Sequence, residues 1–200
     1  MAYNIDPKYY SSRTGLFSKF PNIADVNVKR NNGIKSSPED MPKSIEYYGD
    51  DAPPAVISFT SENWALSESL RAIFDNFAPS NLEVHYISFA LNFIKANIQD
   101  MQYFFVDMVP EASRVIPDKS RYQKVTYPNR QFFSLIGGEG SVVMRKSKPG
   151  DPHIWRERRQ VIGGESYGHS ELQWVVSDEM WEAISKNYAN LFSFYYIEEL

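Results

Sequence analysis

Two stretches of the chain, residues 62–89 and 172–199, carry the same pattern of hydrophobic and polar residues. They align without a gap when the sequence is shifted by the 110 positions between Trp64 and Trp174. The identical pairs are Trp64 and Trp174, Ser67 and Ser177, Tyr86 and Tyr196, and Ile87 and Ile197. Apolar residues also meet apolar residues at the neighbouring positions, so both stretches predict the same local structure.

The pattern predicts a strand end, a capped helix and a second strand in each stretch. Ser67 and Ser177 stand before an acidic residue and an apolar run, as helix N-caps do. After the first serine, apolar residues recur at helical spacing at Leu70, Ile73, Phe74 and Phe77. We therefore predict a pseudo-repeat whose two copies superpose; the alternative is chance combined with the general pattern of capped helices.

The remaining pattern favours strands and turns. Residues 102–109 read as a strand, and Gly137–Gly140 as the turn of a hairpin between residues 131–136 and 141–144. Val26 and Val28 before Asn31-Asn32-Gly33 predict a short hairpin. Together these features predict an α+β fold with a mixed or mostly antiparallel sheet and two main helices. Pro53-Pro54 divides an extended, polar N-terminal segment, 1–54, from a domain at 55–200.

Composition narrows the function classes. The 200 residues contain no Cys, which excludes disulfides and thiolate metal sites, and the net charge of −4 argues against general nucleic-acid binding. No apolar run is long enough for a membrane span, and the first residues lack an apolar leader segment. We expect a cytoplasmic protein without a cofactor.

Catalytic motifs are weak. The three histidines, His85, His153 and His169, stand alone, without the spacing of a metal site. The sequence contains no Gly-x-Ser-x-Gly nucleophile motif, and Ser67 and Ser177 already serve as helix caps. Asp107, inside the apolar run 102–109, is the acid of most interest, and a structural carboxylate is the simpler interpretation. An enzyme would have to assemble its site from scattered loops, for example as a hydrolase that uses Asp107 and His153.

Several of these segments resemble a family of predicted immunity proteins that accompany polymorphic, contact-dependent toxins in bacteria. The resemblance covers residues 55–200 and rests on motifs that occur in the same order. They are Trp64-x-x-Ser67-Glu68, QYFFVDMV at 102–109, Asp118–Tyr122, His153–Glu157, and the closing VVSDEMWEAI…FYYIEEL. The resemblance implies an α+β fold and a non-enzymatic inhibitor that binds a cognate toxin protein in the cytoplasm of the producing cell. It carries over no active-site residues.

Two surfaces are candidates for the contact with such a partner. The acids Asp50 and Asp51, with Glu198 and Glu199 near the end of the chain, would suit a basic toxin. A run of cations that includes Arg156 surrounds Trp155 and would suit an acidic toxin, because Arg and Trp commonly anchor interfaces. The net charge favours the acidic surface.

Overall fold

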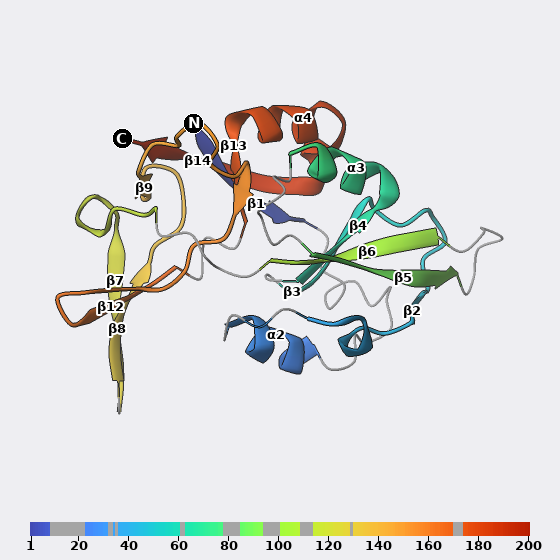
Figure 1. Cartoon of the computed structure of the whole chain (residues 1–200), viewed down its shortest axis with the longest axis horizontal. Coiled ribbons are helices and arrows are strands. Elements are labelled where there is room, and N and C mark those ends of the chain that lie inside the picture. The colour runs from blue at the N-terminus through green and yellow to red at the C-terminus, as the bar shows by residue number, and fades with distance from the viewer. Residues whose placement is uncertain are drawn as a thin grey trace. The chain divides into compact units, whose positions relative to one another are not determined.

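The computed structural model describes residues 1–8, 23–31, 34, 36–60, 63–77, 85–93, 101–108, 114–128, 130–169 and 174–200. The chain forms two compact units (Figure 1). Unit 1 consists of Met1–Asp6, Pro110–Glu182 and Phe194–Leu200, and unit 2 consists of Pro7–Val109 and Ala183–Ser193. The segment 1–54 contributes to both units, and its separation from 55–200 as a domain stays a prediction.

Unit 2 is built on one five-stranded sheet with the strand order β2-β5-β6-β4-β3. The strands are β2 (Ser44–Tyr47), β3 (Val56–Thr60), β4 (Asn63–Ser67), β5 (His85–Phe93) and β6 (Met101–Asp107). All neighbours are antiparallel except β2 and β5, so the sheet is mixed. This central sheet organises the unit.

Helices cover both faces of this sheet (Figure 1). Helix α3 (Glu68–Phe77) buries Leu70 and Phe74, two residues of the predicted apolar stripe. On the other face, helix α2 (Ile23–Asn31) buries Val26 in a cluster with sheet residues that include Ile57 and Phe105. The 3₁₀ turn η1 (Pro38–Asp40) follows α2. The result is a three-layer unit with an apolar core on each side of the sheet.

The hairpin predicted from Val26 and Val28 is wrong, because both valines lie in helix α2. Val26 is fully buried, whereas Val28 is 59% exposed. Valine has only a weak preference against helix, and burial of one side chain in a core overrides it. Asn32 and Gly33, the predicted turn, lie outside the described residues.

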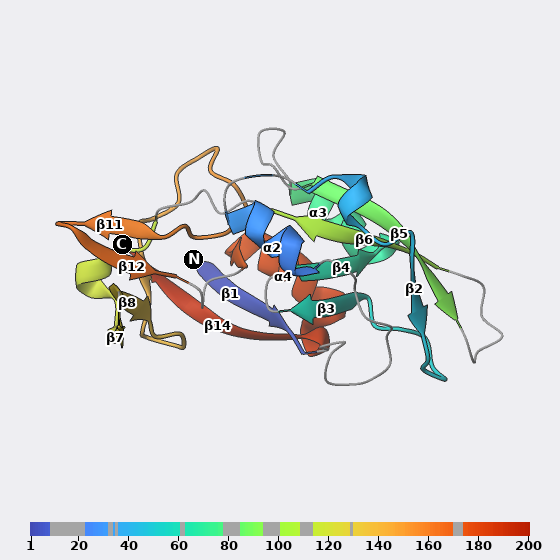
Figure 2. The ribbon, with the colours of Figure 1, turned by 90° about the horizontal axis from the view of Figure 1, so that it is seen from below.

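Unit 1 contains a second five-stranded sheet, ordered β10-β13-β1-β14-β9. Its strands are β1 (Ala2–Pro7), β9 (Val143–Met144), β10 (Ile154–Trp155), β13 (Val175–Ser177) and β14 (Phe192–Glu199). Helix α4 (Asp178–Tyr188) and the 3₁₀ turn η3 (Ala189–Leu191) join β13 to β14, and the part of this connection from Ala183 onward belongs to unit 2. The N-terminal strand β1 is the central strand, beside β14 (Figure 2).

A four-stranded sheet, ordered β11-β12-β8-β7, completes unit 1. It comprises β7 (Tyr122–Tyr127), β8 (Arg130–Leu135), β11 (Gln160–Ile162) and β12 (Glu165–Gly168), after the 3₁₀ turn η2 (Pro117–Lys119). Gly163 and Gly164, both with positive φ, form the two-residue turn between β11 and β12. We call this sheet the arm sheet.

The hairpin predicted around Gly137–Gly140 is also wrong. Its two strands belong to different sheets, since β8 pairs with β7 and β12, whereas β9 pairs with β14. The glycines do form a turn, with positive φ at Gly138 and Gly140. A turn sequence fixes the local reversal of the chain, but the partners of the flanking strands depend on contacts far away in sequence.

The two five-stranded sheets have corresponding connections. In unit 2, β4 lies antiparallel between β3 and β6 and leads into α3; in unit 1, β13 lies antiparallel between β10 and β1 and leads into α4. Each sheet also ends in a parallel edge pair, β2 with β5 and β9 with β14. The predicted order of strand, helix and strand is present twice, and superposition of the two copies stays a prediction.

The helix caps are formed as the sequence indicates. The Oγ of Ser67 accepts a hydrogen bond from the backbone N–H of Leu70 at 3.4 Å, and the Oγ of Ser177 accepts one from Met180 at 3.2 Å. In both cases the serine satisfies the donor three residues ahead. None of the described helices is long and apolar enough to cross a membrane.

Candidate functional site

The candidate site is a polar pocket in unit 1 with a volume of about 440 Å³. It lies among the loop Ser147–His153, Met1, and the start of helix α4 at Ser177–Glu179. The loop reverses at Gly150, which has a φ of 87°, and the Asp151 N–H donates to the carbonyl of Lys148 at 3.0 Å. This tight turn and the helix cap together set the walls of the pocket.

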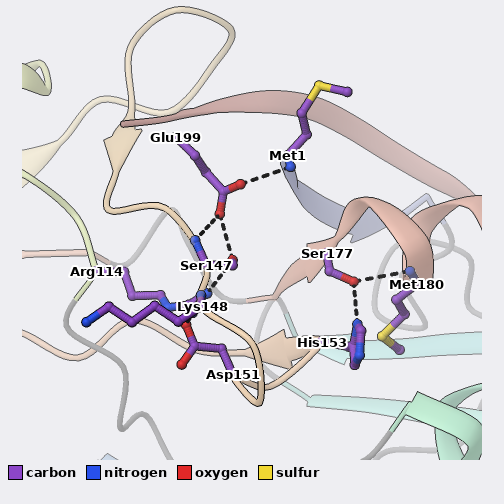
Figure 3. A network of polar contacts seen from close by, with 9 residues as sticks. All are labelled: Met1, Arg114, Ser147, Lys148, Asp151, His153, Ser177, Met180 and Glu199. Carbon is purple, nitrogen blue, oxygen red and sulfur yellow. Dashed lines mark hydrogen bonds and ion pairs between the residues drawn. The ribbon is translucent and has the colours of Figure 1, made fainter.

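His153 faces the capped end of helix α4 (Figure 3). Its Nδ1 lies 2.8 Å from Ser177 Oγ and 3.2 Å from a carboxylate oxygen of Glu179. In a catalytic triad the serine and the acid contact opposite nitrogens of the imidazole. Here both oxygens lie at the same nitrogen and the Ser177 hydroxyl also caps the helix, so this arrangement orders the helix terminus and is unlike a triad.

Glu199 connects the end of β14 to the loop (Figure 3). One carboxylate oxygen accepts from the Ser147 hydroxyl at 2.8 Å and from its N–H at 3.3 Å, and the other lies 2.9 Å from the Met1 amino group. Burial by itself would raise the pKa of Glu199, but these donors outweigh burial and hold the pKa below its ordinary value. Glu199 is therefore a structural carboxylate, with only 7% of its side chain exposed.

Arg114 contacts both this loop and the core of the unit. Its guanidinium donates to Ser147 Oγ at 3.1 Å, pairs with Asp151, and lies 4.4 Å from the ring centroid of Trp155. The Lys148 N–H donates to Asp151 at 2.7 Å and is the main cause of a lowered pKa of that carboxyl, to which Arg114 adds. Asp151 is thus held ionised as part of the loop.

The structure corrects the surface role predicted for Trp155 and Arg156, because both side chains are buried, with exposed fractions of 2% and 4%. Trp155 belongs to the core cluster of unit 1, and its Nε1 donates to Glu157 at 3.1 Å. Glu157 also accepts the backbone N–H of Arg114 at 2.9 Å. Burial nevertheless dominates and raises the pKa of Glu157.

The other predicted site residues lie in different parts of the fold. Asp50 and Asp51 are exposed in unit 2, and Glu198 is exposed in unit 1. Asp107, at the end of β6, belongs to unit 2, and His153 belongs to unit 1, so the structure does not bring this pair together in one unit. Over the described ranges, no group of three or more His, Asp or Glu residues is arranged to hold a metal ion.

Comparison with known protein families shows to which family the chain belongs. A model described as the immunity protein family Imm11 matches residues 2–199, nearly the whole chain. The chain belongs to the Imm11 family. The match confirms the resemblance to immunity proteins, and it extends this relationship into the first 54 residues, which include β1, α2 and β2. A comparison with curated proteins finds no match.

The sequence predicts the helix cap at Ser177 but not the pocket of this Imm11 member. Ser177 was recognised as a cap and His153 as an isolated histidine, and the structure places them together. Arg114 and Ser147 carried no sequence signal, because their roles depend on Glu199 and Asp151, which lie 37 or more positions away. Only the folded chain joins these residues.

Proposed function

We propose that this protein is a non-enzymatic immunity protein, which binds a cognate bacterial toxin and neutralises it in the cytoplasm of the producing cell. The observation that carries the proposal is the Imm11 match over residues 2–199. Immunity proteins protect the cell that makes the toxin, so the partner is a toxin protein. The proposal includes no nucleic-acid ligand and no cofactor.

The polar pocket supports a binding role over catalysis. Three of its polar side chains already serve the structure: Ser177 caps a helix, Ser147 binds Glu199, and Asp151 closes the turn of the loop. A general base needs a nitrogen or oxygen within reach of the proton that it removes, and a nucleophile needs a base of its own. Ser177 Oγ does lie 2.8 Å from His153 Nδ1, but this hydroxyl caps helix α4, and the carboxylate of Glu179 lies at the same nitrogen rather than at the opposite one, where the acid of a triad would lie.

The test is co-production with the toxin domain encoded next to this gene. We expect growth to be restored, and the two proteins to co-elute in size-exclusion chromatography. Titration then separates inhibition from enzymatic reversal. A binding inhibitor abolishes toxin activity only near equimolar amounts, whereas an enzyme would act far below one equivalent.

A double variant, Asp107→Asn with His153→Gln, addresses the hydrolase alternative directly. We expect full protection by this variant, because neither side chain takes part in chemistry under the proposal. Loss of protection by a variant that still folds and still binds the toxin would contradict a non-enzymatic function. An alternative contact surface, which would suit a basic toxin, is the acidic one predicted from the sequence, of which Asp50, Asp51 and Glu198 are exposed.

A further inference from the structure

We infer that one face of the arm sheet is the surface that binds the toxin, and that the toxin presents carboxylates around an apolar patch to it. This inference rests on the proposed function. We call this surface the Val161 face and define it by Val125, Tyr127, Phe132, Arg159 and Val161. It differs from both partner surfaces predicted from the sequence.

Strand pairing places these residues on the same side of the sheet. Val125 pairs with Phe132 across β7 and β8, and Val161 pairs with Ser166 across β11 and β12. Because Tyr167 pairs with Phe133, Ser166 lies beside Phe132. Side-chain contacts agree with this placement, because the Arg159 guanidinium lies 5.8 Å from the Phe132 ring centroid and donates a hydrogen bond to Ser166 Oγ.

The Val161 face exposes apolar side chains to solvent. Val161 is 71% exposed and Tyr127 is 50% exposed, while Val125 and Phe132 are half-buried. Tyr127 stacks on Phe132, with ring centroids 6.1 Å apart and an interplanar angle of 16°. Clustered apolar side chains on an exposed sheet mark an interaction site more often than scattered ones do.

Aromatic residues on the opposite face of the same sheet pack against one another. There Tyr167 stacks on Phe133 at 5.1 Å and meets Tyr122 edge-on at 5.1 Å. This face runs into the core of unit 1 through Leu135, which is buried. It also carries the exposed acid Glu165 and the exposed cation Lys124. The two faces therefore differ in packing, and of their described strand positions only those of the opposite face include an acid.

Charge identifies the chemistry of the partner. Residues 114–169 contain eleven Lys or Arg against five Asp or Glu, although the whole chain has a net charge of −4. On the Val161 face, no acid occupies a described strand position, and the exposed Arg159 lies against Phe132. A basic surface with an apolar centre is complementary to an acidic one with an apolar centre, and such complementarity favours fast and selective association.

A protein fits this face better than a nucleic acid does. Single strands bind by stacking bases on free aromatic rings beside cations. The Phe132 ring is already covered by Tyr127 and Arg159, and the most exposed residue is the aliphatic Val161. Aliphatic side chains contribute burial to protein interfaces and give no stacking surface.

Adjacent residues of β11 provide a matched pair of variants. Val161 and its neighbour Ile162, which is 45% exposed, point to opposite faces. We expect Val161→Glu to weaken affinity for the toxin by about tenfold or more, and Ile162→Glu to change it by less than about threefold. A second pair is Arg159→Glu on the Val161 face and Lys124→Glu on the opposite face. We expect Arg159→Glu to weaken affinity for the toxin and Lys124→Glu to change it little. Thermal unfolding of each variant checks that the fold is kept.

The measurement is the dissociation constant for the toxin domain at low and high salt, together with growth protection. Arg159→Glu should also reduce the dependence of affinity on salt. The inference is overturned if Val161→Glu and Arg159→Glu bind like the parent, if Asp50→Lys with Asp51→Lys abolishes binding instead, or if single-stranded RNA competes with the toxin. Failure of the parent protein itself to bind or protect would overturn the proposed function, and this inference with it.

Discussion

Replacing Trp155 tests whether this residue is a core residue, as the structure shows, or an interface anchor. The indole is 2% exposed and packs in the unit 1 cluster with residues such as Val175 and Ile197. It also lies against the Arg114 guanidinium and donates a hydrogen bond to Glu157. Trp155→Ala removes all of these contacts together.

The expected cost is large. Truncation of a buried aromatic side chain to alanine costs about 3–5 kcal/mol from lost burial and the remaining cavity. Loss of the donor to buried Glu157 adds about 1–3 kcal/mol. Since domains of this kind are stable by only about 5–15 kcal/mol, we expect Trp155→Ala to unfold the unit or leave it close to unfolding.

Trp155→Phe separates packing from the hydrogen bond, because phenylalanine keeps most of the ring volume and loses the N–H. Its cost should be smaller than that of alanine, and it should depend on pH. Burial raises the pKa of Glu157 in the folded protein above its ordinary value. As pH rises, the unfolded chain therefore loses this proton before the folded protein does. The free energy of unfolding falls between the unfolded and the folded pKa of Glu157. Loss of a donor to the carboxylate raises the folded pKa further and extends this interval upward.

Urea denaturation, followed by circular dichroism at several pH values, measures both effects. We expect the order parent, Trp155→Phe, Trp155→Ala in decreasing stability, with the gap between parent and Trp155→Phe wider at pH 8 than at pH 4. The claim that Trp155 is a core residue would be refuted if the free energy of unfolding of Trp155→Ala lay within about 1 kcal/mol of that of the parent while the variant no longer bound the toxin.

Further expectations concern the core, the caps and a buried histidine. Phe74→Ala should lower the free energy of unfolding by about 3–5 kcal/mol because Phe74 is fully buried, and Arg158→Ala by less than about 0.5 kcal/mol; thermal melts rank them. Ser67→Ala and Ser177→Ala should each cost about 1 kcal/mol in urea denaturation, and a cost near zero would mean that the cap bond is not formed. Burial lowers the pKa of His169, so stability should fall as pH drops below its ordinary value of 6.5; His169→Gln should flatten that slope in pH-dependent melts.

The features that the sequence alone determined are local. A helix cap needs only a serine and the N–H three residues ahead, so Ser67 and Ser177 could be recognised without any knowledge of the fold. The apolar stripe of α3 likewise follows from helical spacing, and Leu70 and Phe74 are buried as it predicts. The resemblance to immunity proteins could also be seen in the sequence, because each motif that carries it is a short contiguous segment.

Tertiary structure decided which segments became neighbours. Ala2 pairs with Ser177, so β1 is the central strand of a sheet whose other strands lie beyond residue 142. Strand pairing uses backbone N–H and C=O groups that every residue except proline carries, so the sequence does not show which strand becomes the partner. For the same reason, the cations around Trp155 looked like a surface motif. The indole is buried because β13 pairs with its strand, a contact made 20 residues further along the chain at Val175.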